Sequence, residues 1–441
     1  MKMKKFAAAL MGLSMAVSLT ACGGSASSSS ESSSETSKAE TTQGSSTAAT
    51  GDTLTVAIWD TNQEPGLTKI INEFTQKTGI KAQIQVTPWD QYWTMLEAGA
   101  SGGSLPDVFW MHSNEINKYA KYEMLLDLTD RIKSSDKVEM DKFPEDIVNI
   151  YNYNGKQYAV PKDIDTIALW YNKKMFDEAG LKYPDESWTW DDFKNACAKL
   201  TKPDGSQYGY ALSPSNNQDG WYNMVYAMGG EIISEDKKAS GFDKEGTIKA
   251  IEFIGDIAKK YMPKYETLTD TGATVLFESG KVAMITQGSW MLAELCNNDY
   301  VKANADVAVL PKDATTGRRV SIYNGLGWAA AANTKNPDAA WQLIEYLGSK
   351  EAQQKQSDLG IVISAYEGTT ENWVKAYPSF NLKAYLDMMK DLQIRPYSKS
   401  TVVWENMLSE KLVKVWTGES DAKTVCADIT KEMNALLAEE E

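Results

Sequence analysis

The sequence predicts an α/β fold with two lobes, each a mostly parallel sheet flanked by helices. Strand-like and helix-like segments alternate from residue 54 to residue 111, and the alternation starts again after residue 165. The first 52 residues differ from the rest in composition, which leaves about 390 residues able to fold, and single cores seldom grow past ~300 residues. A foldable part of this length favours two lobes over one.

The first group of elements reads strand, helix, strand, helix, strand. Leu67, Ile70, Ile71 and Phe74 recur at helical spacing, and Gly79 is a suitable helix end. The next stretch alternates apolar and polar residues, as a half-buried strand does. The expected elements are strands over 54–60, 80–88 and 106–111 and helices over 66–79 and 90–99. This order is typical of a parallel sheet covered by helices.

The second group repeats the strand-to-helix pattern. Thr189 is a suitable N-cap for the helix of "TWDDFKNACAKL", and Pro337 occupies a tolerated first helical position. The other expected elements are a strand entering a helix over 165–180, a strand entering a helix at the Gly-Ser-Trp turn 288–290, and strands within 307–311 and 324–333. The C-terminal part is predicted to be helical, with a break at "IRPYSKS".

The N-terminus has the three-part layout of a secretory signal peptide. Lysines at positions 2, 4 and 5 precede the apolar run 6–19, which is shorter than the ~20 residues that a membrane-spanning helix needs. Residues 19–22, "LTAC", resemble the lipobox of bacterial lipoproteins, in which the cysteine becomes the lipidated first residue. We therefore expect a signal peptide over 1–21 and lipid on Cys22; the alternative is an ordinary signal peptide with an incidental cysteine.

A polar tether follows Cys22. Sixteen of the 28 residues from Gly23 to Thr50 are Ser or Thr, and none is Val, Ile, Leu, Met or aromatic. Such a segment cannot bury enough apolar surface to fold. Residues 22–52 are thus expected to form a flexible tether that spans roughly 30 Å as a random coil.

Composition disfavours several classes of partner. The formal net charge is −15, which disfavours nucleic acid and anionic substrates because both require basic patches. Trp and Tyr together number 35, and flat rings both fill cores and line sugar-binding clefts. Beyond Cys22 there are three cysteines, Cys197, Cys296 and Cys426, an odd number that we interpret as small core residues rather than a disulfide framework.

Catalytic and cofactor motifs are missing from the sequence. It has no G-x-S-x-G elbow, no phosphate-binding G-x-x-x-x-G-K-[ST], no H-E-x-x-H, and no dinucleotide fingerprint after the first strand. The single histidine, His112, rules out a histidine-rich metal site. Sixty acidic residues leave a glycosidase neither excluded nor supported. We expect no cofactor, no metal-binding residues at the ligand site and no enzyme activity; a structural metal ion elsewhere is left open.

The loops that follow predicted strands are the candidate binding loops. Ligands of open α/β sheets bind outside the carboxyl ends of the strands. Here those loops carry Trp59-Asp60, His112-Ser113-Asn114 and Gln287-Gly288-Ser289-Trp290. Each offers a planar ring, hydrogen-bonding groups or both, which is the combination that a sugar requires.

Four segments together resemble a known family. They are "LPDVFWMHSNEINKYAKYEMLLDLTD", "YAVPKDIDTIALWYNKKMFDEAG", "GKVAMITQGSW" and "NGLGWAAAANTKNPDAAWQLIEYLGSKEAQQ". In this order they are similar to family 1 extracellular solute-binding proteins, which include the lipoprotein receptors of sugar ABC importers. The resemblance covers residues 54–437. It implies a type II periplasmic-binding-protein-like fold with a ligand cleft between lobes, lobe 1 being 53–162 plus 326–380 and lobe 2 being 163–325 plus 381–441.

The resemblance also implies ligand contacts. Ser113 and Asn114 stand where maltose-binding members have charged sugar ligands, so the same sugar specificity does not follow. The positions that match cleft residues of the family are Trp59, Asp60, Ser113, Asn114, Asp165, Trp221, Trp290, Arg395 and Trp404.

Several of these positions also have a purely structural interpretation. Asp60 could cap the following helix, Asp165 could accept hydrogen bonds at the hinge, and Trp290 or Trp404 could be core residues. We interpret His112 as a packed or cleft-edge residue rather than a catalyst. Trp89 and Trp93, which flank a helix start, are left open between cleft and core.

The expected function is that of a receptor. The resemblance implies a monomer, lipid-anchored to the outer face of the cytoplasmic membrane, that captures a carbohydrate, most simply an oligosaccharide. Its lobes would close on the sugar and present it to the permease subunits of an ABC importer. Contact with the membrane is expected through the lipid only. The alternatives are a surface-anchored glycoside hydrolase and a receptor for a non-sugar solute such as a polyamine.

Overall fold

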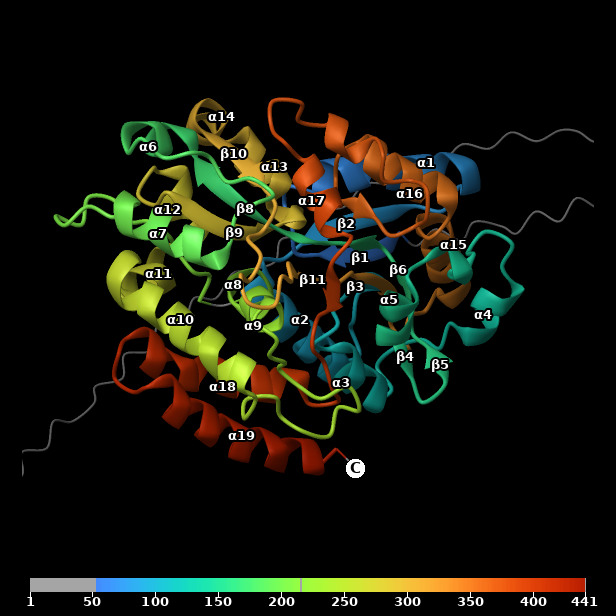
Figure 1. Cartoon of the computed structure of the whole chain (residues 1–441). Coiled ribbons are helices and arrows are strands. Elements are labelled where there is room, and N and C mark those ends of the chain that lie inside the picture. Colours follow the sequence, from blue (N-terminus) through green and yellow to red (C-terminus); the bar gives the residue numbers. More distant parts are fainter. Residues whose placement is uncertain (1–52, 215, 441) are drawn as a thin grey trace, which may run out of the picture. The chain divides into compact units, whose positions relative to one another are not determined.

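The computed structural model describes residues 53–214 and 216–440 (Figure 1). The predicted signal peptide, the lipidated Cys22 and the tether lie outside the described residues. Sheets and helices of the described part form one compact unit. Within it, no helix has the length and apolar character needed to cross a membrane.

A five-stranded sheet organises the first part of the fold. Its strand order is β2-β1-β3-β12-β6, and it is mostly parallel because only β12 runs against its neighbours. The interior strand β1 is buried almost throughout, whereas β2, at the edge, alternates half-buried and exposed residues as its sequence predicts. The strands are β1 (Leu54–Ile58), β2 (Ala82–Val86), β3 (Val108–Met111), β6 (Ala159–Pro161) and β12 (Gly327–Ala330).

Helix α1 (Glu64–Thr78) confirms the first helical prediction. It buries Leu67, Ile70, Ile71 and Phe74 on one face. Gly79 ends it in a left-handed conformation with φ of 76°, and its N–H donates to the Thr75 carbonyl. Helix α2 (Trp89–Gly102) follows β2 and begins one residue before the predicted start.

The second sheet differs from the expectation of mostly parallel strands. Its order is β10-β8-β9, and β8 (Ile167–Asn172) is antiparallel to both β9 (Met284–Gly288) and β10 (Ala305–Ala308). The physical reason is that β8 enters directly from the first sheet, whereas its two neighbours come from far along the chain. No single strand-helix-strand crossover therefore fixes the direction of β8.

The chain passes between the two sheets at three places. It leaves β6 and reaches β8 through β7 (Asp163–Ile164), it returns between β11 (Ser321–Tyr323) and β12, and it passes to the second sheet again between β13 (Ile363–Ser364) and α17 (Lys383–Met388). β7 pairs with β13, and β11 pairs with β14 (Leu392–Ile394). Beyond β13, helix α17 packs against β8 and β10. The residue bounds that we expect for the two lobes stay a prediction.

Helices cover both sheets (Figure 1). The predicted N-cap Thr189 is confirmed, because its side chain and that of Asp192 form a capping box at the start of α7 (Trp190–Leu200). Helices α10 (Glu245–Tyr261), α18 (Thr401–Trp416) and α19 (Ala422–Ala438) pack together at the lower left of Figure 1.

The remaining elements are α3 (Ile116–Lys121), α4 (Thr129–Ser134), α5 (Glu145–Ile150), β4 (Asn152–Tyr153), β5 (Lys156–Gln157), α6 (Lys173–Glu178), α8 (Asn217–Gly220), α9 (Tyr222–Ala227), α11 (Tyr265–Thr271), α12 (Ala273–Glu278), α13 (Leu292–Asn297), α14 (Asp299–Asn304), α15 (Pro337–Leu347) and α16 (Lys350–Asp358), with short 3₁₀ turns at Met140–Lys142, Ser289–Met291 and Trp373–Lys375.

The three described cysteines lie in the core. Cys197, Cys296 and Cys426 are free and buried on α7, α13 and α19. This confirms their interpretation as small packed residues. Burial raises the pKa of each thiol, which makes a reactive thiolate unfavourable.

Candidate ligand-binding cleft

A cleft of about 700 Å³ opens between the loops and helices that belong to the two sheets. The loops after β1 and β3 and the start of α2 line one side. The loop after β9, helix α8 and helix α18 supply most of the rest. Because β1 and β3 are parallel, their carboxyl ends meet at this edge, where open α/β sheets bind their ligands. The volume lies within the range of small-molecule sites.

Aromatic rings cover the first-sheet side of the cleft. The ring centroid of Trp59 lies 5.1 Å from that of Trp89, 5.9 Å from that of Trp93 and 4.8 Å from that of Trp110. Trp110 is fully buried beneath the others, whereas 41% of Trp89 is exposed. The mainly edge-to-face packing fixes the orientation of these rings and leaves apolar faces free for a ligand.

Trp290 supplies a ring from the second sheet. It follows β9 in the turn Ser289–Met291, lines the cleft and is half-buried. The ring lies directly over Gly288, because a Cβ at that glycine would be 2.1 Å from it. The φ of Gly288 is −78°, which any residue adopts, so this close contact rather than backbone strain requires the glycine.

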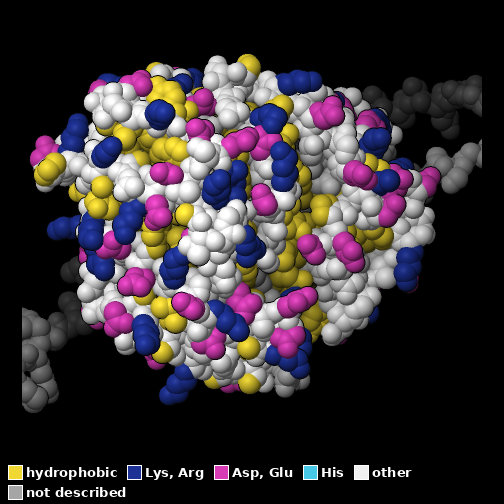
Figure 2. All heavy atoms as spheres, viewed as in Figure 1, with side chains coloured by type: hydrophobic (Ala, Val, Ile, Leu, Met, Phe, Trp, Pro, Cys, Tyr) yellow, Lys and Arg dark blue, Asp and Glu magenta, His cyan; other side chains and the backbone are white. Residues whose placement is uncertain are grey.

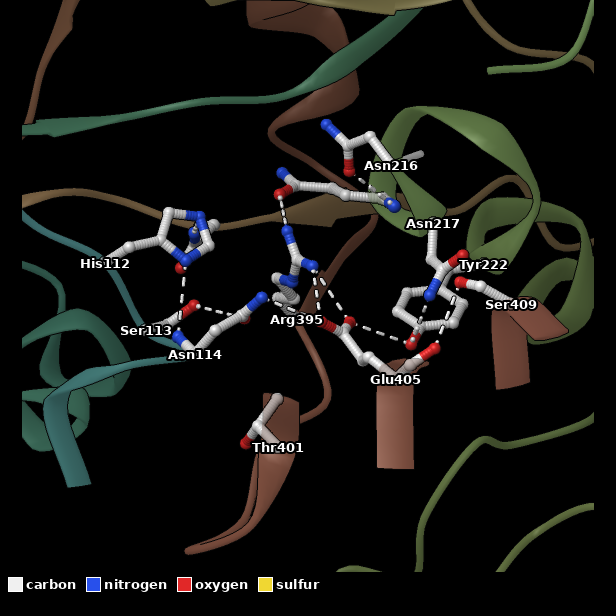
Figure 3. A network of polar contacts seen from close by, with 12 residues as sticks. His112, Ser113, Asn114, Asn216, Asn217, Tyr222, Arg395, Thr401, Glu405 and Ser409 are labelled. Carbon is white, nitrogen blue, oxygen red and sulfur yellow. Dashed lines mark hydrogen bonds and ion pairs between the residues drawn. The ribbon is translucent and has the colours of Figure 1, made fainter. Parts of the chain in front are cut away.

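A buried ion pair lies between the two sides (Figure 3). The Nη2 atom of Arg395 donates to both carboxylate oxygens of Glu405, at 2.8 and 3.0 Å. Asn114, from the loop after β3, donates its Nδ2 to Glu405 Oε2 at 2.7 Å, and Tyr222 donates its hydroxyl to Oε1 at 3.0 Å. Glu405 thus holds groups from three separate parts of the chain.

Asp165 lies where the chain crosses between the sheets. Its Oδ1 accepts from Gln218 Nε2 at 2.5 Å and from the N–H of Asn324 at 3.0 Å. Burial, together with the negative charge of nearby Asp163, raises the pKa of Asp165 to about 7. Burial raises the pKa of Asp219, on α8, to about 8.

Asp60 does not cap a helix, but it holds the turn before α1. It accepts from the N–H of Asn62 and from Gln63 Nε2, both at 2.8 Å. The other end of Gln63 accepts from Lys162 Nζ at 2.9 Å. Lys162 is fully buried, forms an ion pair with Asp163 at 2.5 Å, and connects the cleft loop to the crossing strand.

The comparisons with known proteins now identify the family. A family model described as bacterial extracellular solute-binding protein matches residues 60–354, more than half of the chain. The chain belongs to this family. A putative binding protein of Brucella abortus is 23% identical over 89% of this chain and 95% of its own length. A maltooligosaccharide ABC transporter solute-binding lipoprotein of Streptococcus pneumoniae is 23% identical over 85% of this chain and 86% of that protein.

Solved structures share the two-lobed fold of this solute-binding protein. An ABC substrate-binding protein of Listeria monocytogenes in complex with cycloalternan superposes with a TM-score of 0.80, at 22% identity, over 88% of this chain and all of that one. A cyclic α-maltosyl-1,6-maltose binding protein of Arthrobacter globiformis gives 0.72 at 19% identity, over 87% and 98%. The family consists of solute-binding proteins rather than enzymes.

Six of the nine expected contact positions of the solute-binding protein line the cleft. They are Trp59, Asp60, Asn114, Asp165, Trp290 and Arg395. His112 also lines it, and burial lowers the pKa of its ring well below the usual value, so the imidazole is neutral. Asp165 does accept hydrogen bonds at the crossing, as its structural interpretation predicts, and it lines the cleft as well.

Three of the expected contact residues, Ser113, Trp221 and Trp404, are buried and do not line the cleft. Ser113 is fully buried behind the loop surface. Trp221 is buried and donates its Nε1 to Asn217 Oδ1 at 2.9 Å. Trp404 is fully buried on the inner face of α18 and donates to Ser398 Oγ at 2.9 Å. The ring nitrogens of Trp221 and Trp404 already donate hydrogen bonds within the protein, so we do not propose these two tryptophans as ligand contacts.

The structure places further residues at the cleft, beyond the nine positions expected from the sequence. Trp89 and Trp93, left open between cleft and core, both line the cleft. Gln218 and Asp219 just precede the Trp221 that the family resemblance indicated, and Glu405 follows Trp404. In both segments the family resemblance indicated the correct part of the chain, but the residue that it indicated faces the core rather than the cleft. In the part of the chain that the structure describes, no group of three or more His, Cys, Asp or Glu side chains could hold a metal ion.

Proposed function

We propose that this solute-binding protein captures a carbohydrate in the cleft and delivers it to an ABC importer by closure of its lobes. The observation that carries the proposal is the two-sided lining of the cleft. Tryptophan rings stand on both sides, and amide, carboxylate and guanidinium groups lie between them. A sugar needs this combination, because its C–H faces pack on rings and its hydroxyls exchange hydrogen bonds with polar groups.

The names of relatives support the same ligand class. One relative from Streptococcus mutans is a multiple sugar-binding protein, and another from Bacillus subtilis is a galactooligosaccharide-binding protein. They share 23% and 24% identity with this chain. We extend an oligosaccharide ligand to this chain on the further ground that the cleft, at about 700 Å³, has room for more than one ring.

The mode of action follows from differential binding. A ligand that touches both sides of the cleft binds the closed state better than the open one and shifts the equilibrium toward closure. The importer would then recognise the closed form. We propose that the protein acts as a monomer, held by lipid on Cys22 to the outer face of the cytoplasmic membrane, with no catalytic step.

A glycan panel tests this function. Bound ligand stabilises the folded state by RT ln(1 + [L]/Kd), about 2.7 kcal/mol at a hundredfold excess over Kd, so a thermal shift detects it. Neutral and amino-bearing mono- and oligosaccharides are compared with spermidine. A shift with a sugar supports the receptor. Release of shorter sugars on prolonged incubation would indicate a hydrolase instead, and a shift with spermidine alone would contradict a sugar receptor.

A further inference from the structure

The charges that line the cleft are mostly of one sign. Seven carboxyl side chains and a single guanidinium, that of Arg395, face it. On the outer face shown in Figure 2, by contrast, acidic and basic side chains are interspersed. The acidic lining is therefore a local property of the cleft. The acidic residues are Asp60, Glu115, Asp163, Asp165, Asp219, Glu294 and Glu405.

The basic groups near the cleft already have partners. Arg395 is paired with Glu405, and the buried Lys162 is paired with Asp163. The ammonium of Lys118 lies 4.0 Å from Glu115. Among the described residues, no basic side chain comes within ion-pair distance of the other four cleft carboxyls, Asp60, Asp165, Asp219 and Glu294. These four carboxyl groups thus have no ion-pair partner within the described part of the protein.

Asp219 has an acceptor atom that the protein leaves unused. Only 3% of the residue is exposed, and its Oδ1 is buried without a hydrogen-bond partner among the described residues. Buried polar atoms are nearly always paired, and an unpaired carboxylate oxygen is especially unfavourable. Asp219 lines the cleft, so a donor group of a ligand bound there would lie beside this carboxyl.

The surrounding groups suit a cation better than a neutral donor. A hydroxyl can donate to Asp219, but it would leave this carboxyl protonated, because burial raises the pKa of Asp219 to about 8, whereas an ammonium would favour its ionised form. A hydrogen bond between an ammonium and a carboxylate has charge on both partners and is roughly twice as strong as a neutral one. The tryptophan faces of the cleft also attract cations through their ring quadrupoles.

We infer that the ligand is a carbohydrate that carries a protonated amino group, with the ammonium placed against Asp219. This inference rests on the proposed sugar-binding function and narrows its substrate class. Asp219 is then the residue that distinguishes an amino sugar from its neutral counterpart. Arg395 is already paired with Glu405 in this network, so it does not serve as the ion-pair partner of Asp219 (Figure 3).

Matched sugar sets test the inference. Mono-, di- and trisaccharides of gluco and galacto configuration are compared with a hydroxyl, an acetamido or an amino group at carbon 2, using calorimetry at fixed pH and ionic strength. We expect the amino member of at least one set to bind tenfold or more tighter than its hydroxyl and acetamido partners. The acetamido member is the control for size, because it adds bulk without charge.

Variants assign the effect to Asp219. Asp219→Asn preserves shape and is expected to lower the preference for the amino sugar over its hydroxyl partner by tenfold or more. Asp130→Asn, at an exposed carboxyl on α4, is the matched control and should leave the preference unchanged. Melting temperatures of both variants report whether they fold. A preference that survives in folded Asp219→Asn would overturn the assignment.

The wild-type panel separates the two proposals. Equal or tighter binding of the hydroxyl or acetamido members overturns the amine inference and leaves the sugar receptor in place. Binding of spermidine in preference to every sugar overturns the carbohydrate proposal, and with it the amino sugar. If no sugar and no amine binds at millimolar concentration, both proposals are wrong.

Discussion

Asn114 and Glu405 are 291 positions apart in the chain, yet their side chains meet at 2.7 Å. Asn114 follows the central part of the first sheet, whereas Glu405 lies on α18, which packs against α10 and α19. The bond therefore joins two separately built sides of the cleft without any ligand. Glu405 can accept it because each carboxylate oxygen accepts more than one hydrogen bond, so Oε2 bonds to Asn114 and to Arg395 together.

The first prediction concerns this bond. A hydrogen bond to a charged group contributes about 1.5–3 kcal/mol. Asn114→Ala should therefore favour separation of the two sides roughly tenfold to a hundredfold in the ligand-free protein. Solution scattering should show a larger radius of gyration for this variant. Asn372→Ala is the control, since Asn372 bonds to Asp358 on the exposed surface. Equal radii for both variants and the wild type would contradict the prediction.

The second prediction concerns the buried Lys162. Lys162→Met leaves Asp163 without its cation, and breaking a buried pair in this way is destabilising by about 3–5 kcal/mol. Lys77→Met, which breaks an exposed pair with Glu351, should lower the free energy of unfolding by no more than about 1 kcal/mol. Denaturant unfolding measures both.

A double variant tests the cause. Lys162→Met combined with Asp163→Asn removes both charges, so it should recover part of the loss. If the double variant is less stable than the single one, the other contacts of Asp163 outweigh the unpaired charge, such as the hydrogen bond that its Oδ1 accepts from the N–H of Leu326 at 2.7 Å.

The order of strands and helices was predictable because it depends on local sequence features, namely the spacing of apolar residues and the residues at helix ends. Apolar spacing located α1, and Gly79 and Thr189 marked helix boundaries through their own backbone and side-chain chemistry. The direction of β8 was not predictable in this way. It depends on strands that join it from distant parts of the chain, and no local pattern records that pairing.

The site was predictable only in part, for a similar reason. Trp59, Asp60 and Trp290 follow strands directly, so their place at the cleft follows from the strand order. Trp404 shows the limit. A tryptophan near a cleft can face the ligand or the core. On a helix, adjacent residues face different directions, so a shift of one position decides between the two. Glu405, the neighbour of Trp404, lines the cleft instead.

The third prediction compares two tryptophans with the same substitution. Trp404→Ala removes a fully buried ring and should lower the free energy of unfolding by about 3–5 kcal/mol. Trp290→Ala removes a half-buried cleft ring, so it should lower stability much less and weaken sugar binding a hundredfold or more. Unfolding curves and calorimetry separate the two effects. Retained affinity in Trp290→Ala would remove this ring from the proposed site.

A milder variant tests the position of the same ring. Gly288→Ala introduces a methyl group where the ring of Trp290 now lies, so the ring must move. Affinity should fall while the fold persists. Gly102→Ala is the control, because its added methyl group would be 3.6 Å from the nearest atom.

The fourth prediction concerns Cys22, which lies outside the described residues. The sequence places it at the expected cleavage site, before a polar tether. Cys22→Ala should abolish incorporation of labelled lipid and release the protein from the membrane fraction or leave it unprocessed. Cys296→Ala is the control, since this thiol is buried in the fold. Labelling that persists in Cys22→Ala would show that the lipobox interpretation is wrong.

The fifth prediction concerns pH and the carboxyls of Asp165 and Asp219. Their pKa values in the folded protein are about 7 and about 8, whereas an unfolded Asp has a pKa of about 3.9. Between these values the folded state binds more protons than the unfolded state. The free energy of unfolding should therefore fall as pH rises from about 5 to about 8, by at most about 1.4 kcal/mol per pH unit for each carboxyl.

Isosteric variants test whether these two carboxyls cause the fall in the free energy of unfolding with rising pH. Asp165→Asn and Asp219→Asn cannot ionise, so each should flatten the decline over its own part of the range, and Asp219→Asn should do so at the higher pH. Asp130→Asn should not change the slope, because Asp130 is exposed. A ligand with an ammonium group should reverse the trend, because it stabilises ionised Asp219. Denaturant unfolding at closely spaced pH values, with and without the amino sugar, measures both. A decline that is unchanged in the two cleft variants would place its origin elsewhere in the protein.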